Sequence, residues 1–462
     1  MIMRLNPPSI LTRWAVLPLA IWLYTAPAAL AQDYGAPTAP PAQGFQLSSV
    51  SGYVIYYSKS VPLTAGLQPI SGNLPSDVGA GASARLGWSR FRERTDIVFT
   101  YTPSYSGRAR YSGVDAFNQA SSVNIMRKIT PRLTLTVSGA VDYSSIEQFL
   151  FSPTAFGSVV AVPASFEDLS GAVLAGRFTN PLLAAAVTAA PLANSPALNL
   201  LYGSRTFTSA AQTSLSYSYS PRLSFATYAS ASRNQHVSDT LNIAGRNDHL
   251  IPSTTSGSVG VSFSYALSPV TQLGGSITGS RVSSSLLADR FTTTSLGTLG
   301  RTLARRWLVQ VHGGVGIISP IRVVGGPVNL SMRSLPVVGG TVGLRNFSHS
   351  ILGTYERTAG DSYGIGATST SSATVSWRWS RPGRPWWVES GVTWEQLQGS
   401  ALSEMSGWRT TSGFGRAVGS HATLLTEYVY LRYSGRQIGN GSFSESAVRV
   451  SMAWNKQPRP TR

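Results

Sequence analysis

Residues 129–143 read ITPRLTLTVSGAVDY, and this stretch contains the two signals that decide the fold. From Leu133 onward, apolar residues alternate with polar ones, which predicts a β-strand with one apolar and one polar face. Before the strand, Thr130 is followed by Pro131, whose fixed φ and missing N–H favour a tight turn. The stretch therefore predicts a turn that leads directly into a one-sided strand.

Nearly the same phrase returns as YSPRLSFATYA at 219–229, and a fainter copy, LSPVTQLGGSI, occupies 267–277. We interpret the repetition as a tight turn that is used several times, and not as a duplicated binding site. Arg132 and Arg222 are then expected to begin the returning strands on their polar side, whereas Val270 takes that position in the third copy.

The alternation recurs along the chain and predicts eighteen strands, although a count of sixteen also fits the pattern. Most of them form pairs in which a short turn alternates with a longer polar loop. The expected strands are 45–57, 80–91, 95–107, 119–128, 132–144, 206–218, 222–234, 255–266, 270–282, 291–303, 306–318, 335–346, 349–358, 367–379, 385–397, 407–417, 420–433 and 443–454.

The N-terminus has the pattern of a secretory signal peptide over residues 1–31. Two arginines precede the apolar segment WAVLPLAIWLYTA, and Ala29-Leu30-Ala31 supplies the small residues of a cleavage site before Gln32. The chain contains no cysteine, which excludes disulfides and a lipid anchor on cysteine. We expect an exported bacterial protein with a flexible linker at 32–44 and a basic tail at 455–462.

Short turns on one side and longer loops on the other resemble the porin-like class of bacterial outer-membrane β-barrels. The resemblance covers nearly all of the mature chain and implies an all-β, transmembrane, antiparallel up-and-down barrel over 45–454, with the short turns in the periplasm. It also implies outer-membrane localisation, and contact with membrane lipid, lipopolysaccharide and the barrel-assembly machinery. The final strand ends near Trp454, but NKQPRPTR follows, so this chain departs from barrels that end on an aromatic residue.

Tryptophans on the apolar faces are spaced as two interfacial girdles would be. Trp386 and Trp394 share a face, and eight residues of a strand tilted by about 40° rise roughly 20 Å. That rise is close to the height of an outer-membrane apolar band, about 25 Å. The girdle is expected to contain Trp307, Trp377, Trp379, Trp386, Trp394 and Trp454.

On the polar faces, charged residues are expected to line a pore. Opposed arginines and carboxylates would create a transverse field, and an excess of arginine would favour anions. The alternative is that these charges pair across strands and hold the wall rigid. The expected lining residues are Arg85, Arg132, Arg306, Arg345, Arg378, Arg449, Glu389, Glu395 and Glu427.

A long apolar loop at 145–205 interrupts the regular pattern. Loops of this length are usually functional or disordered. The loop could fold into the lumen as a plug or constriction, or pack against its neighbours at the surface. Deletion of residues 155–195 distinguishes these alternatives, because only removal of a constriction raises conductance.

Charge and motifs argue against several other function classes. The net charge is +18, but the arginines are spread along the chain and form no basic stripe, so we expect no nucleic-acid partner. The five histidines show no metal-ligand spacing, no serine lies in GxSxG, and no phosphate-binding glycine loop is present. We therefore expect no enzyme activity, cofactor or metal.

These observations favour a passive channel for small hydrophilic solutes, with a preference for anions. Two alternatives remain open at this stage: a barrel that serves polysaccharide export, and a non-conducting structural or adhesive surface protein. A secreted soluble β-protein would need a second sheet to cover the apolar faces. The sequence does not determine the oligomeric state or the solute.

Overall fold

The computed structural model describes residues 44–58, 76–110, 115–145, 205–238, 253–284, 289–304, 306–322, 332–346, 348–359, 369–381, 383–398, 405–435 and 442–455. The expected signal peptide (1–31), all but the last residue of the linker, most of the loop at 145–205 and nearly all of the tail at 455–462 lie outside these residues.

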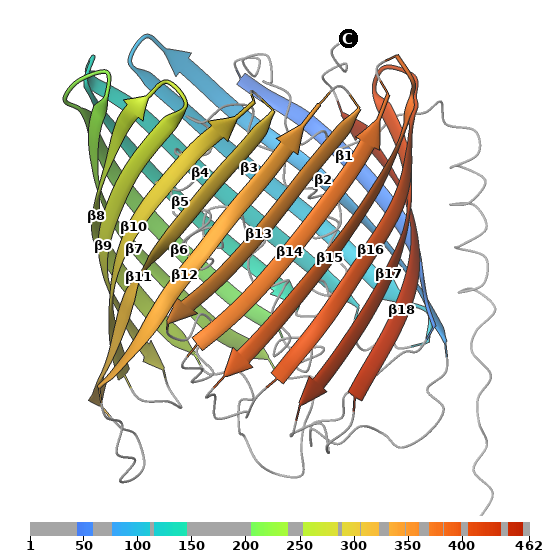
Figure 1. Cartoon of the computed structure of the whole chain (residues 1–462). Coiled ribbons are helices and arrows are strands. Elements are labelled where there is room, and N and C mark those ends of the chain that lie inside the picture. Colours follow the sequence, from blue (N-terminus) through green and yellow to red (C-terminus); the bar gives the residue numbers. More distant parts are fainter. Residues whose placement is uncertain are drawn as a thin grey trace, which may run out of the picture.

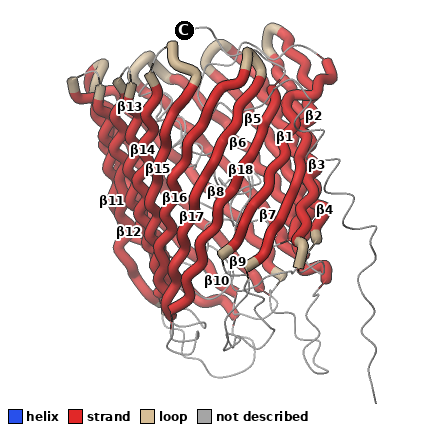
Figure 2. The backbone as a smooth tube through the Cα atoms, turned by 90° about the vertical axis from the view of Figure 1, so that its right-hand side faces the viewer, coloured by secondary structure: helices blue, strands red, loops and turns tan. Residues whose placement is uncertain are grey.

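The described chain forms one closed barrel of eighteen antiparallel strands (Figure 1), so the alternative count of sixteen is wrong. Each strand pairs with its neighbours in sequence, and β1 (Gly44–Tyr57) also pairs with β18 (Ser442–Asn455), which closes the sheet. Closure gives every strand a partner on both sides and leaves no open edge. Figure 2 shows the tilted strands forming a continuous wall.

The remaining strands are β2 (Asp77–Arg92), β3 (Thr95–Arg108), β4 (Ala116–Thr130), β5 (Leu133–Ser145), β6 (Arg205–Ser218), β7 (Leu223–Ser238), β8 (Thr254–Ser268), β9 (Thr271–Ser284), β10 (Asp289–Leu303), β11 (Trp307–Arg322), β12 (Arg333–Arg345), β13 (His349–Ala359), β14 (Ser369–Ser380), β15 (Trp386–Gln398), β16 (Met405–Val418) and β17 (Ala422–Gly435). All of the expected strands are confirmed, with ends that differ by a few residues. The loop between β5 and β6 spans 146–204, whereas the turn between β2 and β3 is only 93–94.

The repeated phrase does form a repeated turn. The hydroxyl oxygens of Thr130, Ser220 and Ser268 each accept a hydrogen bond, at 3.3 Å, from the backbone N–H two residues later. Val270 takes the same place in its turn as the two arginines do in theirs, so the turn depends on the hydroxyl and the proline.

One detail of this prediction was wrong. Arg132 and Arg222 lie in the turns, because β5 begins at Leu133 and β7 at Leu223. The two carbonyls nevertheless accept hydrogen bonds from Ser218 N at 2.9 Å and Ala266 N at 2.8 Å. The arginines therefore extend the backbone ladder to the neighbouring strand without belonging to the assigned strand.

The two faces of the wall differ as the alternation predicts. Outward positions carry many exposed apolar side chains, among them Val54, Val259, Val375 and Trp408. Inward positions are mostly polar, but apolar side chains are buried where β17 and β18 meet β1, including Ile55, Val429 and Leu431. No helix among the described residues is long and apolar enough to cross a membrane.

Candidate functional site

The inner wall carries a row of charged side chains that are cross-strand neighbours. Register partners place Arg378 beside Glu389, Glu389 beside Gly413, Gly413 beside Glu427, and Glu427 beside Arg449. Arg378 lies two residues before the end of β14, so the row starts near a short turn. The register partners continue from Arg449 to Ile55 on β1 and Gly79 on β2. The partner of Gly79 is Arg108, the last residue of β3. We call Arg378, Glu389, Glu427 and Arg449 the charged row.

Arg449 and Glu427 form a buried ion pair within the charged row. Arg449 Nε donates a hydrogen bond to Glu427 Oε2 at 2.8 Å, and Arg449 Nη2 contacts the same oxygen. The two side chains are only 2% and 3% exposed. A pair this enclosed neutralises itself, so its main effect is to connect β17 and β18 near the closure of the barrel.

The Trp387 side chain contacts both Glu389 and Arg378. The Trp387 indole N–H donates to Glu389 Oε2 at 3.2 Å, and the Arg378 guanidinium carbon lies 4.8 Å from the centre of a Trp387 ring. Gly415 on β16 provides the space, since a Cβ there would collide with the indole. This contact explains why a tryptophan can face inward: its apolar ring is covered and its N–H has an acceptor.

Glycines separate the members of two charged pairs. A Cβ at Gly413 would lie 3.0 Å from Glu389 Cγ and 3.4 Å from Glu427 Cγ, so these carboxylate side chains approach over the glycine. In the same way, His312 Nε2 lies 3.0 Å from Glu356 Oε2 across Gly339, although the two residues are on β11 and β13. In both cases, a glycine on the intervening strand leaves room for side chains from the two flanking strands to approach each other.

The other expected lining residues have different positions. Arg85 is an exposed member of β2, on the face shared by Ser83 and Ser89. Arg132 and Arg306 are exposed in short turns. Arg345 and Glu395 lie in β12 and β15, but their side chains fall outside the described residues. The charged row therefore brings together four of the expected residues.

A second part of the inner wall has no Asp, Glu, Lys or Arg at its described inward positions. From β6 to β9 the inward side chains are mainly Ser, Thr, Asn and Gln, and they bond to one another across strands. Ser230 Oγ lies 2.7 Å from Ser258 Oγ, and Ser232 Oγ lies 2.6 Å from Ser256 Oγ. We call the inward side of β6–β9 the hydroxyl wall. In the sequence, the serines that alternate with apolar residues along these strands are the signal that could have predicted the hydroxyl wall.

The expected girdle tryptophans lie at positions that alternation directs outward. The ring centres of Trp379 and Trp386 are 4.7 Å apart beside a short turn, and the centres of Trp394 and Trp408 are 6.3 Å apart nearer the other end. Trp408 was missing from the expected set. Trp307 is exposed at the start of β11, and Trp454 lies near the end of β18.

Chemically, the inner wall offers charges and hydroxyls along a closed surface. No group of three or more His, Cys, Asp or Glu side chains in the described part of the chain could hold a metal ion. The arrangement suits repeated weak contacts with polar solutes along a path.

No protein-family model and no curated protein matches this chain. Among solved structures, Pseudomonas aeruginosa OccK2 (OpdF) in complex with glucuronate is 12% identical with a TM-score of 0.44; the alignment covers 90% of this chain and 100% of that one. P. aeruginosa OccK9 (OpdG) is 9% identical, with coverages of 88% and 98% and a TM-score of 0.44. A BenF-like porin from P. fluorescens Pf-5 is 10% identical, with coverages of 88% and 98% and a TM-score of 0.42.

Proposed function

We propose that this protein is an outer-membrane channel for passive diffusion of small hydrophilic solutes, with a preference for anions. The observation that carries the proposal is the closed eighteen-stranded wall with apolar residues outside and polar residues inside. In a bilayer, such a wall satisfies its backbone internally and presents a water-compatible lumen. The short turns would face the periplasm, as in bacterial barrels of this kind.

The preference for anions follows from how the lumen charges are paired. Glu427 is neutralised by Arg449, and Glu389 accepts the Trp387 N–H beside Arg378. Arg85, in contrast, is exposed on the inner face of β2. An exposed guanidinium attracts carboxylates and phosphates over several ångströms, whereas a buried ion pair contributes little field.

Planar-bilayer recording of the purified, refolded protein tests the channel itself. We expect single-channel events, and a reversal potential in a KCl gradient that indicates preference for Cl⁻. Absence of channel events from correctly folded protein would reject the channel and favour a non-conducting surface protein.

Substitution tests the origin of the selectivity. Arg85→Gln should shift the reversal potential toward cations, because it removes an exposed inward charge. Arg416→Gln is the matched control, since Arg416 is exposed on the outward side of β16, where Phe414 also points outward. Equal reversal potentials for both variants and the parent protein would show that Arg85 does not determine the ion selectivity.

Liposome swelling extends the test to organic solutes. Glucuronate and glucose are similar in size but differ by one carboxylate, so they form a suitable pair. Faster uptake of glucuronate, reduced by Arg85→Gln, is the expected result. Equal uptake rates for glucuronate and glucose would show that the channel has no charge preference.

A further inference from the structure

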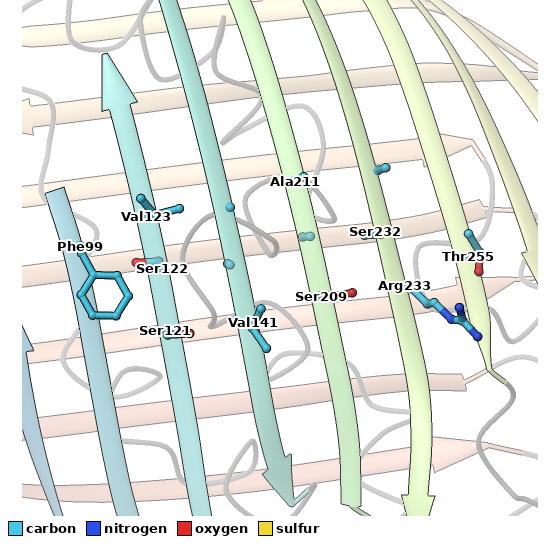
Figure 3. Close-up of a pocket in the computed structure, with 14 residues that line it drawn as sticks. Phe99, Ser121, Ser122, Val123, Val141, Ser209, Ala211, Ser232, Arg233 and Thr255 are labelled. Carbon is cyan, nitrogen blue, oxygen red and sulfur yellow. The ribbon is translucent and has the colours of Figure 1, made fainter. Parts of the chain in front are cut away.

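The outer wall contains a groove between β3 and β8 that the channel function does not require. Its volume is about 420 Å³, and Figure 3 shows the side chains around it. Small residues from four neighbouring strands form its floor, and Phe99, Val123 and Val141 stand beside them. The floor residues are Ser121, Gly139, Ser209, Ala211 and Ala231. We call this feature the outer groove.

The groove faces away from the lumen. On β5, the exposed residues Val137 and Val141 flank Gly139 on the same face, and on β6 Ala211 shares the face of exposed Leu215. Elsewhere this outer surface carries larger side chains, such as Val342, Val375 and Trp408. The groove is therefore a local hollow in the surface that would contact lipid.

Packing within the barrel does not explain two glycines at this surface. A Cβ added at Gly139 would meet nothing closer than 3.5 Å, and one at Gly257, the register partner of Ala231 on β8, nothing closer than 3.8 Å. By contrast, a Cβ at Gly81 would collide with Tyr53. A glycine that weakens a strand without relieving internal crowding often marks the close approach of a ligand or another backbone.

A positively charged side chain, that of Arg233, lies at one end of the groove. Arg233 belongs to the groove lining and is exposed on the outer side of β7. When the oxygen and nitrogen of the Gln235 side-chain amide exchange places, the oxygen accepts hydrogen bonds from Arg233 Nε at 2.9 Å and from Arg233 Nη2 at 2.6 Å. This contact uses two of the five guanidinium N–H bonds and leaves three to other acceptors. Arg281, on the neighbouring part of the outer surface, is ion-paired with Asp289 at 3.0 Å.

The height of Arg233 matches that of a lipid head group. Arg233 is ten residues beyond Leu223, where β7 begins beside a short turn. At about 3.3 Å per residue and a tilt of about 40°, that distance corresponds to a rise of roughly 25 Å. The apolar band of an outer-membrane barrel is about 25 Å tall. Arg233 thus lies at the far edge of the band, and the small-residue floor lies below it at acyl-chain depth.

We propose that the outer groove binds one acylated, phosphorylated glycolipid of the outer leaflet, with an acyl chain on the small-residue floor and a phosphate on Arg233. Guanidinium and phosphate form bidentate, charge-assisted hydrogen bonds. The charge and the depth together favour this occupant over an apolar surface of a second barrel, which would leave Arg233 without a counter-charge.

Native mass spectrometry of the full barrel released from nanodiscs tests the proposal. The nanodiscs contain phosphatidylcholine with a small fraction of acylated bisphosphorylated glucosamine disaccharide (lipid A), or the same disaccharide without phosphates, or phosphatidylglycerol. We expect one retained lipid A per barrel. Arg233→Gln should lower retention roughly tenfold, the effect of losing about one charge-assisted contact.

A second variant tests the floor while Arg233 stays in place. Ala231→Leu fills the groove from the outside and should also lower retention of lipid A, by at least as much as Arg233→Gln does. Val375→Leu and Arg416→Gln are matched controls on outward faces away from the groove, and both should bind as the parent protein does. Conductance should be unchanged in all four variants, which separates this proposal from the channel function.

Three results would overturn the inference. Retention that is unchanged in Arg233→Gln and Ala231→Leu would show that the lipid binds elsewhere. Equal retention of phosphatidylglycerol or of the dephosphorylated disaccharide would show that no specific glycolipid is recognised. A dimer or trimer that Ala231→Leu converts to monomer would identify the groove as an interface between copies of the chain.

Discussion

The charged row and the hydroxyl wall belong to the same barrel, but they hold their polar groups in different ways. In the charged row, Arg449 and Glu427 are almost completely enclosed and depend on each other. In the hydroxyl wall, paired serines such as Ser230 and Ser258 are part-buried and form neutral hydrogen bonds. Removing one member of a buried ion pair leaves a charge without compensation, whereas removing one hydroxyl leaves a group that water can satisfy. Substitutions in the two regions should therefore lower the free energy of unfolding by different amounts.

The largest effect is expected for Arg449→Met. Glu427 would remain buried without its partner, and the free energy of unfolding should fall by about 3–5 kcal/mol. Urea unfolding in lipid vesicles, followed by tryptophan fluorescence, measures this change. The double variant Arg449→Met/Glu427→Gln should recover most of the loss. If the single variant loses less than about 1 kcal/mol, the pair does not stabilise the closure of the barrel.

Gly413→Ala tests the close approach of the two carboxylate side chains within the charged row. The added Cβ would lie 3.0 Å from Glu389 Cγ, so one side chain must shift. Overpacking of this kind costs about 1–3 kcal/mol. Gly313→Ala on β11 is the matched control, because a Cβ there would meet nothing within 4 Å. Equal unfolding midpoints for both variants would contradict the crowding at Gly413.

Ser258→Ala examines the hydroxyl wall. The substitution removes the partner of Ser230 at 2.7 Å, and we expect a loss of about 1 kcal/mol in unfolding free energy. The same urea experiment gives the value, and Ser230→Ala/Ser258→Ala should lose little more than the single variant. A loss comparable to that of Arg449→Met would erase the distinction between the two regions.

The smallest effect is expected for Val270→Arg, which makes the third copy of the turn identical to the first two at this position. The hydroxyl bond is 3.3 Å in all three turns, so the side chain after the proline does not control the geometry. The unfolding free energy should change by less than about 0.5 kcal/mol. Ser268→Ala, which removes the hydroxyl acceptor, should cost more than Val270→Arg, and the reverse order would show that the arginine shapes the turn.

Much of the fold could be predicted because its signals are local. Alternation with a period of two assigns the inner and outer face of each strand, and the turn residues separate one strand from the next. These patterns located all eighteen strands and directed Arg449, Glu427 and Glu389 inward. They also set Trp386 and Trp394 on the outer face at two levels. The first strand residue after Pro131 and Pro221 was misjudged, because those arginines bond like strand residues while lying in turns. The expected strand 306–318 was also begun one residue early, since Arg306 lies in the turn before Trp307.

Which side chains meet was decided by the tertiary structure. The contact of Arg449 with Glu427, that of His312 with Glu356 across Gly339, and the outer groove all depend on register between neighbouring strands. Register is a relation between separate segments, so alternation within one strand leaves it undetermined. The local sequence thus determined which faces are polar and which are apolar, whereas the register between strands decided how charges, glycines and small residues are grouped on those faces.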